Sequence, residues 1–494
     1  VTLLNRQKYA EAAPHLQYAV EQEPDNALAL TNYGWLLAVM ERDRQAMDIY
    51  ERLLDPKFER QIDRTELFFG LAILYARLDQ HEKGIALLEP EFGNVKTPHE
   101  NNRVFLNLAE AYRSTGRLDD AAGTLDRLEN LVPEASVGLV LARARLAAAR
   151  DDFDGGASML AGALKTHPEA HADIHLSLAR LEMERKYHRR AIDAFVKAVE
   201  AAPGEDRLAI LSEMTKSFAA AERSGDATPV LERFATAGGG QDAAISLLLA
   251  ENLVQSGRKK DALSLLDRQI AANPKLAQAH LLKAVVLRGE SRVAEARDAM
   301  RASVDADPAN PAAWHLLADL VHDTDGDVAM LAAFKEGLGH NPTDPHLLLG
   351  TGSIAYSQGD VAYAAEIFTR LVARYPDDPM ALSNAALAHL DLDRNMDKAR
   401  VLLERALERA PRVPAIVDTW GWMLHKSGKS AEAIELLERV AQVLPDDGGV
   451  SYHLGIAYEA TGQDGLGRAS LRRALALGVP EHYRGDIVRR LSAQ

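Results

Sequence analysis

The chain has 494 residues, 47% of them hydrophobic and 26% charged, a mixture typical of folded globular proteins and unlike that of disordered chains. Its 72 Asp and Glu residues outnumber its 57 Lys and Arg residues, and the net charge of −15 argues against nucleic acid as a partner, because phosphate binding needs a basic surface. The absence of cysteine excludes disulfides, thiolate metal sites and cysteine nucleophiles.

The first predicted element is a lone helix before Pro24. The stretch from Lys8 to Pro24 has the pattern of only the second helix of a repeated unit, and the chain begins with Val1 rather than methionine. No basic and then apolar leader is recognisable, and no segment reaches the roughly 18 consecutive apolar residues of a membrane span. We therefore expect a mature or trimmed fragment without a transmembrane segment.

Prolines that follow apolar helical stretches then recur along the chain, mostly 34 or 35 residues apart. They are Pro24, Pro133, Pro168, Pro203, Pro274, Pro308, Pro342, Pro376, Pro411 and Pro445. Self-similarity at this period predicts an array of stacked helical repeats. Counting by phase predicts about thirteen full repeats after the initial half repeat.

Within each period, small residues recur twelve positions apart, as in Gly34 and Ala46 or Gly352 and Ala364, and predict the close approach of two helices. A glycine at one phase between them predicts a tight reversal. These turn glycines are Gly116, Gly257, Gly359, Gly428 and Gly462. Large apolar residues four positions after the second small residue are predicted to form the core between repeats: Tyr50, Leu125, Phe195, Leu266, Met300, Phe334, Phe368, Leu403 and Leu437.

Two stretches depart from the period. The link from Leu54 to Glu66 is longer than the others, and Gly204 to Gln241 reads as a degenerate repeat that ends in Gly238, Gly239 and Gly240. Within it, Pro229 is predicted to open a helix in its first turn. The predicted organisation is an N-terminal array over 1–203, a degenerate repeat and candidate hinge over 204–241, and a C-terminal array with a capping helix over 242–494.

These phases resemble the tetratricopeptide repeat family. The clearest copies carry Trp314, Leu317, Ala318, Phe334 and Pro342, and then Trp420, Gly421, Gly428, Ala433, Leu437 and Pro445. The resemblance covers nearly the whole chain and implies an all-α solenoid, a right-handed superhelix of helix-turn-helix repeats. It also implies that the first helix of each repeat lines a concave groove that binds a partner protein or peptide.

At the groove-facing phases of the family, the C-terminal third of the chain combines aromatic rings with polar and charged groups, a composition expected of a recognition surface. The candidate partner-binding residues are Asp319, His322, Tyr356, Asn384, Asp418, Trp422, His425, Tyr452, His453 and Glu459. A weaker set is Asn32, Trp35, Asn107, Glu110 and Arg113. The alternative is that Trp422 and Tyr452 pack between neighbouring helices and that Asp418 caps one of them.

Motifs with a chemical function fit the chain poorly. Gly428-Lys429-Ser430 lacks the preceding glycine and strand of a phosphate-binding loop, and Asp323 to Asp327 lacks the glycine position and final glutamate of a calcium loop. His167 and His171 are separated by Pro168, which interrupts a shared helix. The sequence therefore predicts a non-enzymatic protein without catalytic residues, cofactor or metal.

Two resemblances bear on the partner. In chaperone-binding members of the family, Lys, Asn and Arg from three repeats bind a C-terminal carboxylate; here only Asn32 and Asn107 match, so that mode is not expected. Asp418-Thr419-Trp420-Gly421-Trp422 and Tyr452-His453-Leu454-Gly455 resemble the closing repeats of bacterial proteins of exopolysaccharide synthesis and export, of the exosortase-associated type. This implies a scaffold in the bacterial cell envelope or periplasm, with the cytoplasm as the alternative.

Two other functions remain open from the sequence. In the first alternative, the array is a regulatory or substrate-presenting part of a larger enzyme. In the second, the array binds an acidic polysaccharide directly. The second alternative relies on a basic set near the C-terminus, which comprises Arg468, Arg472, Arg473, Arg484, Arg489 and Arg490.

Overall fold

The computed structural model describes residues 9–94, 98–131, 136–237, 242–392 and 396–492. Within these ranges the chain is entirely helical and contains no strand, which confirms the predicted fold class. It divides into two compact units, 1–237 and 238–494. The boundary falls inside the predicted degenerate repeat, whose glycines Gly238 to Gly240 lie outside the described residues, as does Lys8.

The first unit contains helices α2 to α14 and two short 3-10 helices. Their bounds are α2 (Tyr9–Gln22), α3 (Ala27–Val39), α4 (Asp43–Arg52), η1 (Pro56–Phe58), α5 (Arg64–Arg77), α6 (His81–Asn94), α7 (Pro98–Ser114), α8 (Leu118–Leu131), α9 (Val137–Ala149), α10 (Phe153–Thr166), η2 (Pro168–Ala170), α11 (His171–Glu184), α12 (His188–Ala201), α13 (Gly204–Ala220) and α14 (Ser224–Ala237).

The second unit contains helices α15 to α29. Their bounds are α15 (Ala243–Gln255), α16 (Lys259–Ala272), α17 (Ala277–Gly289), α18 (Val293–Ala306), α19 (Pro311–Asp325), α20 (Asp327–His340), α21 (Pro345–Ser357), α22 (Val361–Arg374), α23 (Pro379–Asp391), α24 (Met396–Arg409), α25 (Pro414–Lys426), α26 (Ser430–Val443), α27 (Gly448–Ala460), α28 (Asp464–Leu477) and α29 (Glu481–Ser492).

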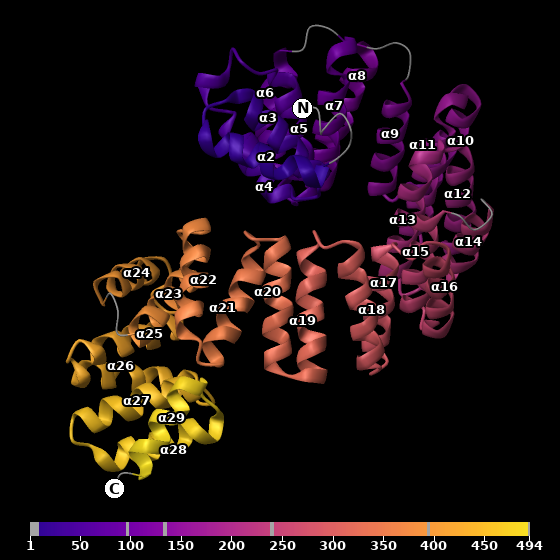
Figure 1. Ribbon diagram of the computed structural model, residues 1–494. Coiled ribbons are helices and arrows are strands. Elements are labelled where there is room, and N and C mark those ends of the chain that lie inside the picture. The colour runs from indigo at the N-terminus through magenta and orange to yellow at the C-terminus, as the bar shows by residue number, and fades with distance from the viewer. Residues whose placement is uncertain (1–8, 95–97, 132–135, 238–241, 393–395, 493–494) are drawn as a thin grey trace. The chain divides into compact units, whose positions relative to one another are not determined.

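Helices α3 to α28 form thirteen consecutive pairs, and each helix packs against its neighbours in the chain within its unit, as Figure 1 shows. Among the described residues, α2 precedes these pairs and α29 follows them. Thirteen pairs agree with the predicted number of full repeats, whereas the predicted half repeat begins at Lys8, outside the described residues, and stays a prediction. Within each unit, consecutive pairs pack against one another, which is the nearest-neighbour architecture of repeat proteins.

At predicted small positions, a large side chain of the paired helix leaves no room for a Cβ atom. A Cβ atom added to Gly34 would lie 2.3 Å from the Tyr50 ring, and one added to Gly352 would lie 2.5 Å from the Phe368 ring. Both rings are buried, as are the other predicted large residues at this phase. Small and large side chains therefore interlock once per repeat and fix the distance between its two helices.

The predicted turn glycines adopt the left-handed conformation that the reversal requires; Gly428, for example, has φ +85° and Gly257 has φ +79°. Repeats without glycine place another residue there with φ near +60°, including Glu41, Lys186 and Ser291. A residue with a side chain is strained in the left-handed conformation, but the packed helices on both sides hold the turn in place.

Two local features differ from the regular repeat. The long link before α5 contains the 3-10 helix η1, whose Phe58 is buried in the core of the first unit. The prediction that Pro229 opens a helix was wrong: it lies inside α14, which begins five residues earlier at Ser224. Burial of Ala227 and Leu231 on either side of Pro229 stabilises the helix through the proline, despite the lost backbone hydrogen bond.

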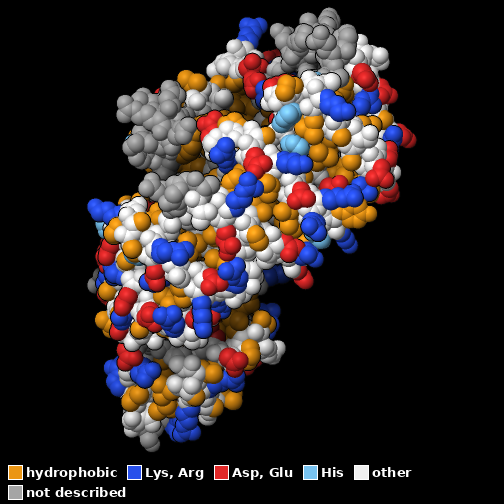
Figure 2. Space-filling view, turned by 90° about the vertical axis from the view of Figure 1, so that its right-hand side faces the viewer, with side chains coloured by type: hydrophobic (Ala, Val, Ile, Leu, Met, Phe, Trp, Pro, Cys, Tyr) orange, Lys and Arg blue, Asp and Glu red, His pale blue; other side chains and the backbone are white. Residues whose placement is uncertain are grey.

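The charges on one face of the molecule are mixed rather than segregated. On the face drawn in Figure 2, Lys and Arg side chains are interspersed with Asp and Glu. Several ion pairs connect successive repeats, such as Arg301 with Glu336 at 2.8 Å and Arg233 with Glu200. Because these pairs are solvent-exposed, each contributes at most about 1 kcal/mol.

Candidate partner-binding sites

One candidate site lies in the first unit, where residues of α3, α4, α5 and α7 line a pocket of about 710 Å³ that we call the N-terminal groove. Residues three or four positions apart on α3 and α5 point into it, since they share one helical face. Its lining residues are Thr31, Asn32, Trp35, Ala38, Val39, Tyr50, Leu53, Ile62, Asp63, Glu66, Leu67, Phe69, Gly70, Ile73, Leu74, Arg77 and Arg103.

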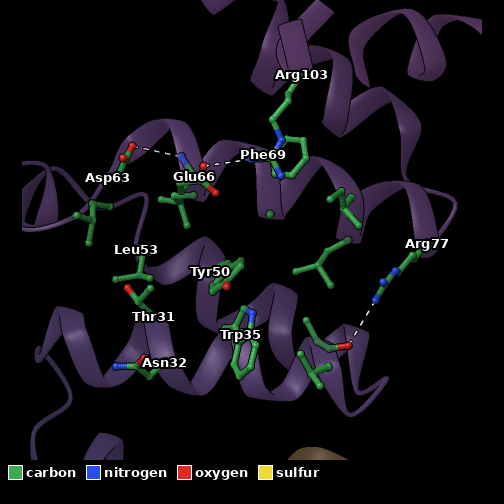
Figure 3. Close-up of a pocket in the computed structure, with 17 residues that line it drawn as sticks. Thr31, Asn32, Trp35, Tyr50, Leu53, Asp63, Glu66, Phe69, Arg77 and Arg103 are labelled. Carbon is green, nitrogen blue, oxygen red and sulfur yellow. Dashed lines mark hydrogen bonds and ion pairs between the residues drawn. The ribbon is translucent and has the colours of Figure 1, made fainter. Parts of the chain in front are cut away.

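Aromatic rings dominate the centre of the N-terminal groove (Figure 3). The Trp35 side chain comes from α3 and remains 42% exposed, although Tyr9 of α2 packs edge-on against it at 5.8 Å. The Tyr50 ring is buried between Gly34 and Gly70, where an added Cβ would lie 2.3 Å and 2.7 Å from it. The two glycines therefore let Tyr50 form part of the pocket wall.

Charged groups surround this apolar centre. The guanidinium of Arg103 lies 3.5 Å from the centroid of the Phe69 ring and forms an ion pair with Glu66 at 3.2 Å. Asp63 accepts hydrogen bonds from the first backbone amides of α5, and Arg77 forms an ion pair with Asp43 at 3.1 Å. An apolar centre with a polar rim is the anatomy of a protein recognition site.

A second pocket of about 430 Å³ lies further along the first unit, and we call it the Arg145 pocket. Three successive first helices, α7, α9 and α11, each contribute one arginine to it. Its lining residues are Glu110, Arg113, Ala144, Arg145, Ala148, Leu160, Ser177, Arg180, Leu181 and Glu184.

Four of the five residues in the weaker sequence-predicted set fall on these two pockets. Asn32 and Trp35 line the N-terminal groove, and Glu110 and Arg113 line the Arg145 pocket. Asn107 lines neither pocket, and its amide donates to the backbone carbonyl of Arg103. The partners that complete these sites, such as Phe69 and Arg145, were not singled out in the sequence because they look like ordinary helix residues there.

In the second unit, several of the predicted partner-binding residues meet in one buried cluster. The Nδ1 atom of His453 lies 3.0 Å from a carboxylate oxygen of Asp418, and its Nε2 atom lies 3.1 Å from the Tyr483 hydroxyl. The Trp422 ring stacks on His453 at 4.5 Å, and the Tyr452 ring stacks on Tyr483 at 4.0 Å.

The last helix, α29, covers this cluster. Its Tyr483 hydroxyl donates to Asp391 of α23 and lies 2.8 Å from the hydroxyl of Tyr356 on α21. Asp391 also accepts a hydrogen bond of 2.8 Å from the Trp422 indole. Further along α29, Asp486 accepts from the Tyr452 hydroxyl at 3.1 Å. Helix α29 therefore contacts several of the predicted partner-binding residues directly.

Burial and charge determine the protonation behaviour of this cluster. Burial alone would lower the pKa of His453, but the Asp418 carboxylate outweighs it and holds that pKa above its ordinary value. Burial would raise the pKa of Asp391, yet hydrogen bonds from His482, Tyr356 and Tyr483 hold it below its usual value. Burial lowers the pKa of His425 to about 4, so this ring is neutral at pH 7.

The ten predicted residues are thus distributed over different environments. Trp422, Tyr452 and His453 are 3%, 6% and 2% exposed, and they pack between helices. Tyr356, Asn384, Asp418 and His453 line a pocket of about 540 Å³ beside α29. The remaining residues lie apart from this pocket: Asp319 and His322 on α19, His425 beside Ser430, and Glu459 in an ion pair with Arg490 at 2.9 Å. Their role in binding a partner stays a prediction.

Other sequence features have structural roles. Gly428 forms the turn between α25 and α26, and Asp325 at the end of α19 forms an ion pair with Arg297 at 3.0 Å. In the basic C-terminal set, Arg484, Arg489 and Arg490 form ion pairs with acidic residues of the same unit.

Among the described residues, no group of three or more potential metal ligands converges. None of the helices in the described ranges is both long and apolar enough to cross a bilayer.

Comparison with known proteins adds relatives of low identity. The chain is 27% identical over 237 residues to a TPR repeat-containing protein of Pseudomonas aeruginosa, a match that covers 48% of this chain and 34% of that protein. It is 28% identical over 135 residues to Protein FlbA of Caulobacter vibrioides, which covers 27% of this chain and 22% of FlbA. The matches therefore span about a third or less of these relatives.

Among solved structures, the chain is similar to a chain in the crystal structure of the APC/C hetero-tetramer Cut9-Hcn1, with 16% identity and a TM-score of 0.34. The match covers 93% of this chain and 95% of that chain. Tetratricopeptide repeat models match residues 3–62, 104–134, 141–206, 247–311, 331–379, 349–414 and 420–481, and one model alone covers more than half of the chain. This chain therefore belongs to the tetratricopeptide repeat family, whose members generally mediate protein–protein interactions.

Proposed function

We propose that the protein is a non-enzymatic scaffold that binds a segment of a partner protein in the N-terminal groove. The observation that carries this proposal is the exposed indole of Trp35 inside a pocket of about 710 Å³. This volume accommodates one large apolar side chain together with its neighbouring backbone. The exposed tryptophan supplies the type of anchor that dominates binding energy at protein interfaces.

The expected gain in binding free energy follows from the exposed area of Trp35. A tryptophan side chain buries up to about 250 Å², so the 42% of Trp35 that stays exposed corresponds to about 100 Å². At about 25 cal/mol per Å², covering that area contributes about 2.5 kcal/mol, which is equivalent to a factor of roughly 70 in Kd. Further contributions come from Phe69 and from polar contacts at the rim of the groove.

The test is co-purification from the native cell with the Trp35→Ala variant, followed by quantitative mass spectrometry. Tyr187→Ala is the matched control, because Tyr187 is a similarly exposed aromatic residue of the first unit that does not line the groove. We expect a partner that is depleted at least tenfold by Trp35→Ala and retained by the control. Equal recovery of all partners from the two variants would exclude the groove as the binding site.

We further propose that this scaffold acts in an assembly of the bacterial envelope that makes or exports exopolysaccharide. The support is the resemblance of residues 418–422 and 452–455 to closing repeats of proteins with that role. If the proposal is right, partners lost with Trp35→Ala include polysaccharide synthesis or export components, and they fractionate with the envelope. Partners confined to cytoplasmic fractions would contradict this assignment while leaving the scaffold function intact.

A further inference from the structure

Helix α29 does not simply continue the array after α28. In a stacked array each repeat contacts only its neighbours, so a further first helix would contact the last pair alone. The Tyr483 side chain of α29 instead contacts four successive first helices, through Tyr356 of α21, Asp391 of α23, Trp422 of α25 and His453 of α27. We call the surface that these four residues form with Tyr452 of α27 the C-terminal face.

Three polar side chains of α29 bind this part of the array. Tyr483, Asp486 and Arg490 are three and four residues apart, so they share one side of the helix. Beyond the contacts of Tyr483, the Asp486 carboxylate accepts a hydrogen bond of 3.1 Å from the Tyr452 hydroxyl, and Arg490 forms an ion pair with Glu459 of α27 at 2.9 Å. A tyrosine, an acceptor and a cation at this spacing are therefore the pattern that the surface recognises.

The attachment of α29 relies on these polar contacts and on little apolar burial. Tyr483 and Ile487 are the buried residues of this helix, whereas Val488 stays 51% exposed. Small polar interfaces within a chain resemble transient contacts between proteins, and the parts that they join are expected to move relative to one another. Elements attached in this way belong to the least stable parts of a fold.

A short link joins α29 to the array. It consists of Gly478, Val479 and Pro480, between the end of α28 at Leu477 and the start of α29 at Glu481. Gly478 has φ +90°, a conformation that glycine adopts readily. Hinges are commonly a few loop residues that absorb a change of backbone angles while the flanking elements stay intact. The link therefore allows α29 to leave the C-terminal face as a unit.

Departure of α29 would uncover residues typical of a binding hot spot. Trp422 and Tyr452 are 3% and 6% exposed, and both rings contact Tyr483. Next to them, Asp391 accepts a hydrogen bond from the Trp422 indole, and His453 stacks on the Trp422 ring. Buried aromatic anchors contribute most of the binding energy at protein interfaces. While α29 is in place, a partner has no access to these rings.

We propose that α29 is a displaceable latch, which occupies the C-terminal face until a helix of a partner protein with the same pattern of side chains takes its place. The partner helix carries a tyrosine that donates to Asp391, an acceptor three residues later for the Tyr452 hydroxyl, and a basic residue four residues further for Glu459. This proposal concerns a second surface and does not depend on the N-terminal groove.

A disulfide can hold the latch closed, because the chain has no cysteine that would compete. A Cβ added to Gly359, in the turn after α21, would lie 3.6 Å from the Cβ of Glu481, within the range of about 3.5–4.5 Å that a disulfide spans. Gly359 has φ +84°, but other repeats place Lys186 and Ser291 at the same turn phase. The Gly359→Cys/Glu481→Cys variant is therefore closed when oxidised and free to open when reduced.

The probe is a fluorescein-labelled peptide with the sequence of residues 481–492. It is stapled between the exposed positions 484 and 488, because a helix of this length is marginal in water. Fluorescence polarisation with the full chain should show binding to the reduced double variant and none to the oxidised one. Glu481→Cys alone is the control and should bind equally with and without reductant. A probe with alanine in place of its tyrosine should not bind.

The open fraction of α29 determines the apparent affinity of the probe, which binds only when the face is free. Tyr483→Phe removes the hydroxyl that donates to Asp391 and should raise this fraction about 100-fold. The apparent Kd of the probe should fall by a similar factor while the open form stays the minor one. Tyr458→Phe, which removes a hydroxyl bonded to exposed Glu438, should leave the apparent Kd unchanged.

Hydrogen exchange distinguishes a latch from a structural cap. In Tyr483→Phe, peptides from 481–492 should exchange faster while peptides from 448–477 keep their wild-type protection. Loss of protection in both segments would mean that α29 completes the fold of the last repeat, and would overturn the latch. The same conclusion would follow from equal probe binding in the oxidised and reduced double variant, or from no gain in probe affinity in Tyr483→Phe.

A second copy of this chain is the alternative occupant of the C-terminal face. The single variants Gly359→Cys and Glu481→Cys are mixed under oxidising conditions and analysed by mass. We expect no preference for a linked heterodimer. A heterodimer that forms in preference to either homodimer would assign the face to α29 of a second copy and overturn the proposal of a partner helix.

Discussion

The attachment of α29 to the rest of the second unit depends on the hydroxyl group of Tyr483. This group donates to Asp391 and lies within hydrogen-bond distance of Tyr356 and His453, which belong to three other helices. The Tyr483→Phe variant removes the hydroxyl but retains the ring that stacks on Tyr452 at 4.0 Å. Its effect therefore reports on the polar network rather than on ring packing.

The magnitude follows from the groups that lose a partner. A hydrogen bond to a charged acceptor contributes about 1.5–3 kcal/mol, and a buried His453 nitrogen left without its partner costs about 1 kcal/mol or more. Asp391 keeps hydrogen bonds from Trp422 and Tyr356, so its charge remains partly compensated. We expect the free energy of opening of α29 to fall by about 3 kcal/mol, which corresponds to a factor of roughly 100.

Amide hydrogen exchange followed by mass spectrometry measures this opening locally, which suits a repeat array that need not unfold in one step. Peptides from 481–492 should exchange about 100-fold faster in Tyr483→Phe than in the wild type. Tyr458→Phe is the control, since its hydroxyl bonds only to exposed Glu438 and it should leave α29 unchanged. Equal protection of α29 in all three proteins would refute the role of the Tyr483 network.

Further predictions concern pH, packing and turns. The pKa of His453 is raised in the fold, so its ion pair with Asp418 stabilises the fold fully below about pH 6.5 and is lost as the pH rises through the folded pKa. Hydrogen-exchange protection of α29, corrected for intrinsic exchange, should therefore fall in that pH window. The His453→Gln variant should remove this pH dependence. Gly352→Ala places a Cβ 2.5 Å from the Phe368 ring and should destabilise the second unit by about 1–3 kcal/mol, measured as a lower melting temperature. Lys186→Gly removes a side chain from a backbone with φ +59° and should raise the free energy of unfolding of the first unit by about 0.5–1 kcal/mol, measured as a higher melting temperature. A lower melting temperature would contradict the assigned strain in this turn.

The repeat architecture was predictable because its determinants are local and recur in every unit. The small residue at Gly34, the turn glycine at Gly428 and the buried ring of Phe368 each occupy a phase that the sequence repeats many times. Tertiary packing overrides such local signals at Pro229, where burial on both sides continues a helix through a proline.

The sites were less predictable, since they depend on contacts between residues distant in sequence. Tyr483 meets Asp391 across 92 positions, and no local pattern marks either residue as a partner of the other. Arg145 of α9 lies 3.3 Å from Glu110 of α7, a contact between repeats that no local pattern marks. By contrast, Trp35 was identified in the sequence because an aromatic residue at a groove-facing phase is a local signal.

The most direct test of the central claim is site-specific photo-crosslinking in the native cell. A benzophenone amino acid is placed at Thr31, which is exposed and lines the N-terminal groove, or at Tyr18, which is exposed on α2 outside it. We predict a partner crosslinked from Thr31 that disappears when Trp35→Ala is added, and no such crosslink from Tyr18. The same crosslinks from both positions, or a Thr31 crosslink that persists in Trp35→Ala, would contradict partner binding in this groove.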